Sequence, residues 1–411
     1  MCIRDRNLSL NLMKSKPANN IQDLQFFGEF GGVNPSISDS STYTFLSANS
    51  MSETFEGNME GCYLYSRNSS PSNLYLEEAC AALEGTEAAN VFSSGMGAIT
   101  ATILQLCKSE DHIISSRTVY GGTYAFLKNF TPQLKIETTF VDITSLDDIN
   151  NSIKPNTKII YCEVSSNPLL EIADLEEISK IAKKNNIKLV VDNTFTPLSI
   201  SPAKYGADVV IHSLTKFING TSDTIAGVVC SSKEFIHSLR DVNDGAFMLM
   251  GTTMDSLRAA SVLKNMRTLH IRMKKHSENA MYLAESFEKD GIKAVYPGLK
   301  SHPSHNIFSK MMNKEYGYGG MVTIDAGILE TANKLMEKMQ DKNLGYLAVS
   351  LGFHKTLFCA PGSSTSSEIS EDEQEKMGLS EGLIRFSVGL DQDISRTYEG
   401  IKKCLKEFNL I

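Results

Sequence analysis

Short apolar runs alternate with longer amphipathic stretches through the middle of the chain. Four runs of four or five mostly apolar residues are predicted to be buried strands of a parallel sheet, at residues 89–92, 158–162, 187–191 and 207–211. Residues 74–83 and 175–184 have the apolar spacing of helices, and Gly85 ends the first of them. This alternation predicts an α/β fold, with a mainly parallel sheet between two layers of helices.

The pattern changes along the chain and divides it into three parts. Residues 1–69 are rich in Asn, Ser and Thr and are predicted to form an extended N-terminal arm. Residues 70–262 carry the alternating strands and helices of a large domain. A long helical pattern over 255–289 leads into residues 263–411, which are predicted to form a smaller α+β domain with a strand at 317–324. The chain has 411 residues, more than one hydrophobic core usually serves, so two domains are expected.

Composition and charge narrow the class of protein. Hydrophobic residues make up 41% of the chain and charged residues 21%, as in ordinary globular proteins. A net charge of −8 without a basic block argues against nucleic acid and anionic membranes as partners, and no apolar run is long enough to span a bilayer. Eight Cys without a CxxC pair predict reduced thiols and a cytoplasmic protein. Eight His without ligand spacing predict no metal site.

The first residues of the chain differ from the rest. Residues 1–6 form neither a signal peptide nor an apolar segment, and Met13 offers an alternative start. We expect this end to be poorly ordered.

Lys216 is placed where the chemistry of an α/β protein usually occurs. The apolar run at 207–211 leads into His212, Ser213, Leu214, Thr215 and Lys216. In open α/β sheets ligands bind beyond the carboxyl ends of the strands. A lysine held in a partly desolvated site loses its proton readily and can form an imine with a carbonyl group. A lone lysine at a strand end is more often a solvated charge, so its neighbours decide between the two interpretations.

Three other segments supply complementary chemistry. Small residues at 93–97 follow a predicted strand and open a helix, where backbone N–H groups can bind a phosphate. Tyr120 precedes two glycines and can stack on an aromatic ring. Asp192 ends another strand and can keep a pyridine nitrogen protonated. With Lys216, these are the parts of a site for pyridoxal 5′-phosphate (PLP). A dinucleotide site is disfavoured because Thr100 stands where that motif has its third glycine.

Each of these features also has an explanation that needs no ligand. The segment at 93–97 can be a tight turn, Tyr120 a core residue and Asp192 a turn or helix cap. Taken singly, none of them identifies a site. Their order along one chain is the more informative observation.

Eight motifs in order resemble the Cys/Met-metabolism family of PLP-dependent enzymes, over most of the chain. They are Tyr65-Ser66-Arg67, Ser94-Gly95-Met96, Tyr120-Gly121-Gly122-Thr123, Glu163 with Asn167-Pro168, Asp192, Ser213-Leu214-Thr215-Lys216, Ser350-Leu351-Gly352 and Leu383-Ile384-Arg385. Any one motif is weak, but eight in sequence are specific. The family includes cystathionine lyases and synthases, O-acylhomoserine sulfhydrylases and methionine γ-lyases. The resemblance implies the PLP-dependent transferase fold type I, with PLP as cofactor.

The resemblance also implies a role for each motif. The implied cofactor-binding residues are Tyr65, Arg67, Ser94, Gly95, Met96, Tyr120, Glu163, Asn167, Asp192, Ser213, Thr215 and Lys216. Among these, Lys216, Tyr120 and Asp192 are expected to be catalytic: Lys216 as the imine-forming lysine that moves protons, Tyr120 as proton donor to the leaving group.

Two further implications concern the substrate and the neighbouring subunit. Arg385, with Ser350 and Asn167, would bind the substrate α-carboxylate, since a guanidinium fork suits that group. A buried structural ion pair is the alternative for Arg385, and a plain turn is the alternative for Asn167. Tyr65 and Arg67 would reach into the neighbouring subunit's site, which implies a dimer that shares its active sites and pairs into a tetramer. Without the resemblance, Arg67 would be interpreted as a charged side chain exposed to solvent.

The choice of substrate depends on smaller differences. Segments at 245–251 and 348–368 resemble plant-type methionine γ-lyases, which implies γ-elimination of L-methionine to methanethiol, 2-oxobutanoate and ammonia. Cystathionine γ-lyases often carry an acidic residue after the Ser-Leu-Gly motif, whereas residues 353–355 here are Phe, His and Lys. Gly122 stands where well-known bacterial methionine lyases have Cys, and Thr221 where many relatives have His.

Other functions stay open on the sequence alone. Within the family, cystathionine γ-lyase, cystathionine γ-synthase and O-acylhomoserine sulfhydrylase are the alternatives to methionine γ-lyase. An inactive homologue that acts as a binding protein is the alternative from another class.

Overall fold

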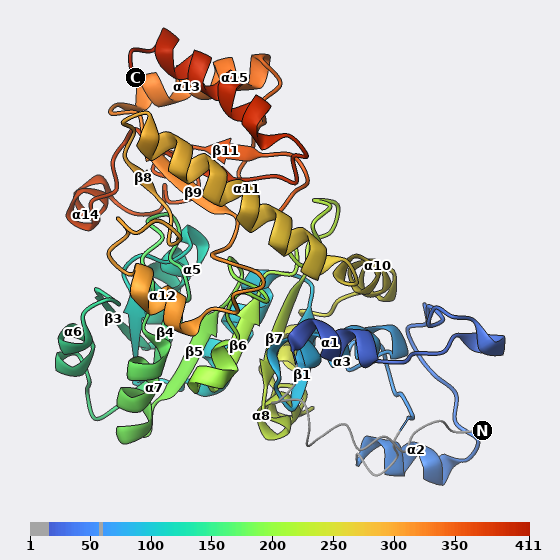
Figure 1. Cartoon of the computed structure of the whole chain (residues 1–411). Helices are drawn as coiled ribbons and strands as arrows, with labels where there is room; N and C mark the ends of the chain where they lie inside the picture. Colours follow the sequence, from blue (N-terminus) through green and yellow to red (C-terminus); the bar gives the residue numbers. More distant parts are fainter. Residues whose placement is uncertain (1–15, 57–60) are drawn as a thin grey trace.

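A computed structural model describes residues 16–56 and 61–411 of the chain (Figure 1). The expectations for residues 1–6 and Met13 therefore lie outside the described residues. The larger of two sheets is made of β1 (Ala88–Phe92), β2 (His112–Ser116), β3 (Glu137–Val141), β4 (Thr157–Glu163), β5 (Lys188–Asp192), β6 (Val209–His212) and β7 (Gly227–Ser231). Its strand order is β1-β7-β6-β5-β4-β2-β3. The strands predicted from the four apolar runs are β1, β4, β5 and β6, each shifted by no more than two residues.

The sheet is mixed, with one antiparallel strand in an otherwise parallel arrangement. β7 runs antiparallel to both of its neighbours, β1 and β6, while the remaining neighbours pair in parallel. The mainly parallel sheet predicted from the alternating pattern is therefore confirmed. Most of its strand residues are buried, as expected for a sheet covered on both faces, whereas in the edge strand β3 only Val141 is buried.

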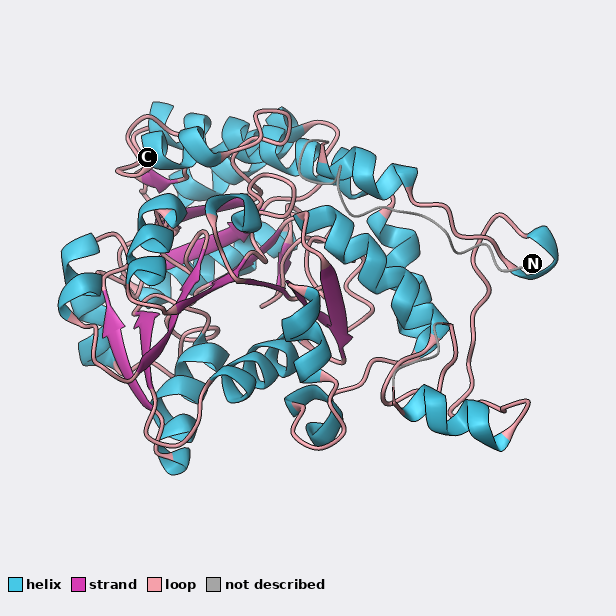
Figure 2. Ribbon diagram, turned by 90° about the horizontal axis from the view of Figure 1, so that it is seen from below, coloured by secondary structure: helices cyan, strands magenta, loops and turns pink. Residues whose placement is uncertain are grey.

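Helices cover the sheet on both faces, which Figure 2 shows from below. The helices of this part are α3 (Pro71–Glu84), α4 (Gly95–Leu106), α5 (Gly121–Ala125), α6 (Leu146–Asn151), α7 (Leu175–Lys184), α8 (Lys233–Leu239), α9 (Ala246–Met250) and α10 (Ser256–Met266). One face packs against α3, α7 and α10, and the other against α4 and α8. α3 has Ser70 as N-cap and the left-handed Gly85 as C-cap, so the predicted stop at Gly85 is confirmed.

A second, smaller sheet lies above the first in Figure 1. It is made of β8 (Ala294–Val295), β9 (Met321–Asp325), β10 (Tyr346–Leu347), β11 (Leu357–Cys359) and β12 (Leu383–Ser387), in the order β10-β11-β12-β9-β8. Its helices are α11 (Leu269–Lys289), α12 (His305–Met311), α13 (Leu329–Asp341), α14 (Glu371–Met377) and α15 (Ile394–Glu407). Apolar residues of α11, α13 and α15 bury one face of this sheet.

Two predictions about helices differ from the structure. The long helical pattern over 255–289 is two helices, because α10 ends at Met266 and α11 begins at Leu269. The N-terminal arm is not wholly extended, since it contains α1 (Pro17–Asp23) and α2 (Ala48–Phe55). Apolar residues of the α1 region pack against the core that includes α3, and this tertiary contact stabilises a helix of only seven residues. Figure 1 shows α2 lying away from both sheets.

None of the helices formed by residues 16–56 and 61–411 is both long and apolar enough to cross a lipid bilayer.

Candidate active site

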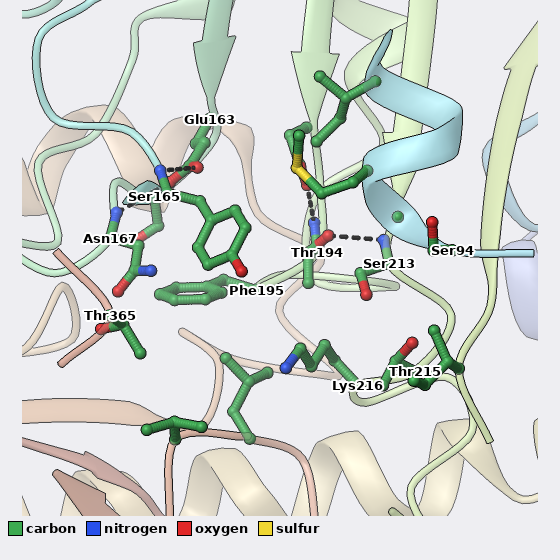
Figure 3. Close-up of a pocket in the computed structure, with 18 of the residues that line it drawn as sticks. Ser94, Glu163, Ser165, Asn167, Thr194, Phe195, Ser213, Thr215, Lys216 and Thr365 are labelled. Carbon is green, nitrogen blue, oxygen red and sulfur yellow. Dashed lines mark hydrogen bonds between the residues drawn. The ribbon is translucent and has the colours of Figure 1, made fainter. Parts of the chain in front are cut away.

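A cavity of about 290 Å³ lies at the carboxyl ends of the central strands of the larger sheet. The structure brings most of the predicted site residues to its wall, namely Ser94, Gly95, Met96, Tyr120, Glu163, Asn167, Asp192, Ser213, Thr215, Lys216 and Arg385. Figure 3 shows Glu163 and Asn167 on one side, Ser94, Ser213 and Thr215 on the other, and the Lys216 side chain pointing into the space between them. Segments far apart in sequence thus meet at one edge of the sheet, as expected for a parallel sheet.

Lys216 lies in the turn that follows β6 and presents its amine to the cavity. The Lys216 Nζ atom donates a hydrogen bond to Ser350 Oγ at 3.2 Å. Burial first, and then the positive charge of Arg385, lower the pKa of the Lys216 amine to about 8. A substantial fraction of the amine is therefore neutral near physiological pH and can act as a nucleophile or base.

The turn before α4 has the form of a phosphate site. Ser94 is the N-cap of α4, and its Oγ accepts a hydrogen bond from Gly97 N at 3.0 Å. The N–H groups of Gly95 and Met96, in the first turn, have no carbonyl acceptor within the helix and point towards its N-terminal end. A Cβ atom on Gly95 would lie 2.9 Å from Ser213 Cβ, so glycine allows this turn to approach the turn after β6.

The hydroxyls on the other side of this turn are partly engaged within the protein. Ser213 N donates to Thr194 Oγ1 at 2.8 Å, which ties the turn after β6 to the end of β5. Thr215 Oγ1 donates to the Ala226 carbonyl at 3.2 Å and accepts from Ala226 N at 2.9 Å. The Ser213 side chain thus remains the more available of the two predicted hydroxyls.

Two buried carboxylates stand side by side at the ends of β4 and β5. Glu163 and Asp192 are paired in the parallel register of these strands, and each is less than a tenth exposed. Burial raises the pKa of both, and the proximity of Asp192 raises the pKa of Glu163 further. Hydrogen bonds donated by Thr194 to Asp192 act in the opposite direction. A cation placed against Asp192 would offset part of the free-energy cost of burying these two carboxylates.

Glu163 anchors two neighbouring site residues through its carboxylate. Its Oε1 accepts from Tyr120 N at 2.7 Å and its Oε2 from Asn167 N at 2.8 Å. Both backbone contacts lower the pKa of Glu163. Glu163 is therefore a positioning residue that fixes where Tyr120 and Asn167 stand, a role more definite than the sequence indicated.

Arg385 connects the two sheets at the cavity. It lies on β12, is 2% exposed, and its Nη1 donates to Asn167 Oδ1 at 2.7 Å. Its Nη2 donates to the Val349 carbonyl at 3.3 Å, while its Nε has no protein partner. Among the described residues, no carboxylate is hydrogen-bonded or ion-paired to Arg385. These residues therefore do not form the buried structural ion pair that was the alternative for Arg385. A buried guanidinium with spare donors suits an incoming carboxylate.

Tyr120 stands at the mouth of the cavity and is 41% exposed. Its pKa is raised, first by partial burial and then by the nearby Glu368 carboxylate. The phenol therefore keeps its proton at neutral pH, as a proton donor must.

Three predicted residues are not on the cavity wall. Ser350 contacts Lys216, as described, and lies just behind that amine. Tyr65 and Arg67 line a separate hollow formed by the N-terminal arm and the α9 region. Arg67 Nη1 donates to the Met248 carbonyl at 3.0 Å, and its guanidinium lies 5.8 Å from the centre of the Tyr65 ring.

Several lining residues were missed from the sequence. They are Ile99, Ser165, Thr194, Phe195, Ile225, Val349, Leu351 and Thr365. Thr194 and Ser165 each lie two residues beyond a predicted site carboxylate, a spacing that could have indicated them. Thr365 belongs to the segment at 348–368, one of the two that resemble plant-type methionine γ-lyases. Ile225 and Val349 carry no comparable local signal, because they come from loops brought in by tertiary contacts.

Comparison with known proteins gives consistent results. The model of the Cys/Met metabolism PLP-dependent enzyme family matches residues 19–404. A methionine gamma-lyase from Arabidopsis thaliana is 44% identical over 388 residues, which cover 93% of this chain and 88% of that protein. A cystathionine gamma-lyase from Bacillus subtilis is 37% identical over 349 residues, covering 82% of this chain and 89% of that protein.

A solved structure from Campylobacter jejuni, assigned as an O-acetylhomoserine (thiol)-lyase, has the same fold. It matches with a TM-score of 0.88 at 29% sequence identity, covering 95% of this chain and 100% of that one. It contains a pyridoxyl-lysine phosphate. The cavity described above offers a matching set of groups: a half-buried lysine amine, a strand-end carboxylate and a helix N-terminus flanked by serine hydroxyls. The residues present fit this group.

Proposed function

This chain belongs to the Cys/Met metabolism family of PLP-dependent enzymes, and on that premise we propose that it is a methionine γ-lyase. The proposed reaction converts L-methionine and water to methanethiol, 2-oxobutanoate and ammonia. The observation that carries the choice of substrate is the wall of the cavity, which is largely apolar and in which the carboxylates from the described residues, Glu163 and Asp192, are both engaged.

The cofactor of this family is PLP, and we assign its contacts to individual residues of this chain. Lys216 would hold the aldehyde carbon through its amine, and Asp192 would hold the protonated ring nitrogen. Ser94, Ser213 and the N–H groups of Gly95 and Met96 would hold the phosphate. When bound, PLP supplies an electron-accepting ring that stabilises negative charge on the substrate carbon atoms.

The protein side chains then have separate tasks in the proposed reaction. Arg385 would bind the substrate α-carboxylate, with Asn167 fixing the guanidinium plane through their hydrogen bond. Lys216, with its pKa lowered to about 8, would take the proton from the substrate α-carbon. Tyr120, whose phenol keeps its proton at neutral pH, would donate that proton to the departing sulfur. Acid and base are thus two different groups: the lowered pKa of Lys216 favours its neutral form, and the raised pKa of Tyr120 keeps the phenol protonated.

The lining of the cavity supports a neutral, apolar γ-substituent. Ile225, Val349 and Leu351 contribute apolar surface to the wall. Among the described residues, the carboxylates that line the cavity are Glu163 and Asp192, and both are engaged as described above. A methyl thioether can be bound by such a surface without an unpaired charge, whereas a distal ammonium would find no unengaged carboxylate among these lining residues.

The test is a comparison of substrates with purified protein. Methionine, cystathionine and O-acetylhomoserine plus a thiol are supplied separately, and 2-oxobutanoate, volatile thiol and thioether product are measured. We expect methanethiol and 2-oxobutanoate in equal amounts from methionine, with the largest kcat/KM for that substrate. A larger kcat/KM for cystathionine, or net synthesis from O-acetylhomoserine, would refute the proposal while leaving the family unchanged.

Cystathionine γ-lyase is a second candidate that one observation favours. Glu368 lies beside Tyr120, whose pKa it raises, and its carboxylate packs against the position where a Cβ of Gly121 would stand. This acid comes from the loop at 362–368 rather than from the segment after Ser-Leu-Gly, and it could face a distal ammonium group. Glu368→Gln distinguishes the two functions. It should raise KM for cystathionine without changing KM for methionine if the acid binds that ammonium.

A shared dimeric site is proposed for Tyr65 and Arg67. Their place on the arm, away from the cavity of their own chain, supports contacts with the site of a neighbouring subunit. Residues 1–69 would then form the intersubunit arm of a dimer, and pairs of dimers would form a tetramer. Mixing Arg67→Ala subunits with Lys216→Ala subunits tests this, since a mixed dimer regains one intact site if the residues act across the interface. Failure to regain activity in verified mixed dimers would contradict it.

A further inference from the structure

Two hydroxyl groups near the candidate site are fully buried. Tyr161 on β4 and Thr123 on α5 are both 0% exposed. Neither the Tyr161 hydroxyl nor Thr123 Oγ1 has a hydrogen-bond partner in the structure. Buried hydroxyls without a partner are uncommon, because each one carries the cost of desolvation.

The Tyr161 side chain is directed to the part of the sheet that carries the carboxylate proposed to hold the ring nitrogen. Tyr161 faces the same side of the sheet as Glu163 and Asp192, because side chains two residues apart on a strand share a face and Glu163 is paired with Asp192. Thr123 influences the pKa of Tyr161, and Tyr161 that of Asp192, although neither contact is a formed hydrogen bond in the structure.

The direction of donation in this cluster is fixed by chemistry. A carboxylate can only accept, so a hydrogen bond between Tyr161 and Asp192 requires Tyr161 to donate. Tyr161 can then accept from the Thr123 hydroxyl. Burial raises the pKa of both Tyr161 and Asp192; Thr123 opposes the first shift and Tyr161 opposes the second.

We propose that Thr123 and Tyr161 are positioning residues that form a buried chain of hydrogen bonds to Asp192 and keep this carboxylate ionised against the cofactor's ring nitrogen. Asp192 needs such help because it is buried beside a second carboxylate, Glu163. Donors that face the ionised form stabilise it, and in a dry environment their effect is larger than in water. The glycines of the Tyr120-Gly121-Gly122-Thr123 motif place Thr123 on the first turns of α5, directly after the catalytic tyrosine.

The experiment measures cofactor affinity rather than turnover. The full-length protein is freed of PLP and titrated with PLP and with its analogue in which a carbon atom replaces the ring nitrogen. Tyr161→Phe should weaken the binding of PLP by about tenfold, the order expected for losing a hydrogen bond to a charged group. The same variant should bind the carbon analogue as the wild type does, because that ring makes no charged contact with Asp192. A loss equal for both compounds, or no loss for PLP, would overturn the proposal.

Matched variants separate positioning from damage to the fold. Tyr296→Phe removes another fully buried tyrosine hydroxyl, one that donates to the Gly319 carbonyl at 2.9 Å beside the smaller sheet, and should leave PLP affinity unchanged. Thr123→Val should weaken PLP binding selectively, and Thr123→Ser, which restores the hydroxyl, should recover it. If Tyr161→Phe does not fold, the threonine pair decides alone. A Thr123→Ser variant as weak as Thr123→Val would contradict the hydroxyl chain.

The proposal rests on the role assigned to Asp192 under the proposed function, and one variant tests that role separately. Asp192→Asn should lose affinity for PLP but not for the carbon analogue. If it loses neither, both the role of Asp192 and the hydroxyl chain are wrong. If it shows the selective loss and Tyr161→Phe does not, only the hydroxyl chain is wrong.

Discussion

Replacing Lys216 by methionine should make the cofactor-free protein more stable at neutral pH. The pKa of this amine is about 8 in the folded protein against an ordinary value of 10.5. The difference of about 2.5 corresponds to roughly 3 kcal/mol by which the folded state disfavours the charged amine. Since solvent reaches the cavity and screens part of this effect, we expect a gain in the free energy of unfolding of about 1–3 kcal/mol. Methionine has nearly the same length and no charge to desolvate.

The sign and the pH range follow from the direction of the shift. Between pH 8 and 10.5 the unfolded chain still binds the proton that the folded protein has released, so the stability of the wild type rises with pH in this range. Below pH 8 the full cost of the charged amine is present, and above 10.5 it is absent. The advantage of Lys216→Met should thus be largest near pH 7 and fall to less than half by about pH 9.5.

Thermal unfolding of the two cofactor-free proteins at both pH values measures this advantage. At neutral pH the melting temperature of Lys216→Met should exceed that of the wild type by a few degrees, since about 1 kcal/mol moves a large domain by roughly 2–4 °C. Replacing the exposed Lys184 by methionine is the control for loss of a surface charge. A wild type that is the more stable at pH 7, or an advantage that does not shrink with pH, would refute the reasoning.

Three further predictions concern individual site residues. Arg385→Lys should raise KM for the amino-acid substrate by about tenfold to a hundredfold, because the planar guanidinium fork is lost. The affinity for PLP, measured by titration, should stay within about twofold. An unchanged KM would exclude Arg385 as the ligand of the substrate carboxylate. Tyr120→Phe should lower kcat by about a hundredfold or more while PLP affinity is unchanged, as expected for loss of a proton donor. A wild-type kcat for this variant in steady-state kinetics would show that another group protonates the sulfur. Gly227→Ala should weaken PLP binding by more than about tenfold, because its Cβ would lie 2.2 Å from the Ser94 carbonyl and must displace the phosphate turn; wild-type affinity in a correctly folded variant would contradict this.

The central part of the fold was predictable because its signals are local. An apolar run of five residues followed by a polar one indicates a buried strand and its carboxyl end, and this placed Asp192 and Lys216 at the same edge of the sheet. The helix 175–184 was predicted with the observed bounds, because its apolar face, acidic first turn and basic last turn can all be recognised within its own sequence. The phosphate turn is equally local, as a serine cap followed by glycine after a strand.

The misplaced elements are those that depend on distant contacts. The break between α10 and α11 follows from how each helix packs, because the apolar spacing of 255–289 continues across it. The short helix α1 forms within a polar arm because it packs on the core that includes α3.

The sequence by itself determined the candidate groups of the site: which strand ends carry the amine and the carboxylates, and which turn is suited to a phosphate. Only the tertiary structure decided the surroundings of those groups, since burial and charge at a site come from segments remote in sequence. It brought Arg385 from the second sheet to lower the pKa of Lys216, left Arg67 outside the cavity of its own chain, and buried the hydroxyls of Tyr161 and Thr123. Chemical identity is a property of single residues, whereas electrostatic environment is a property of the packed chain.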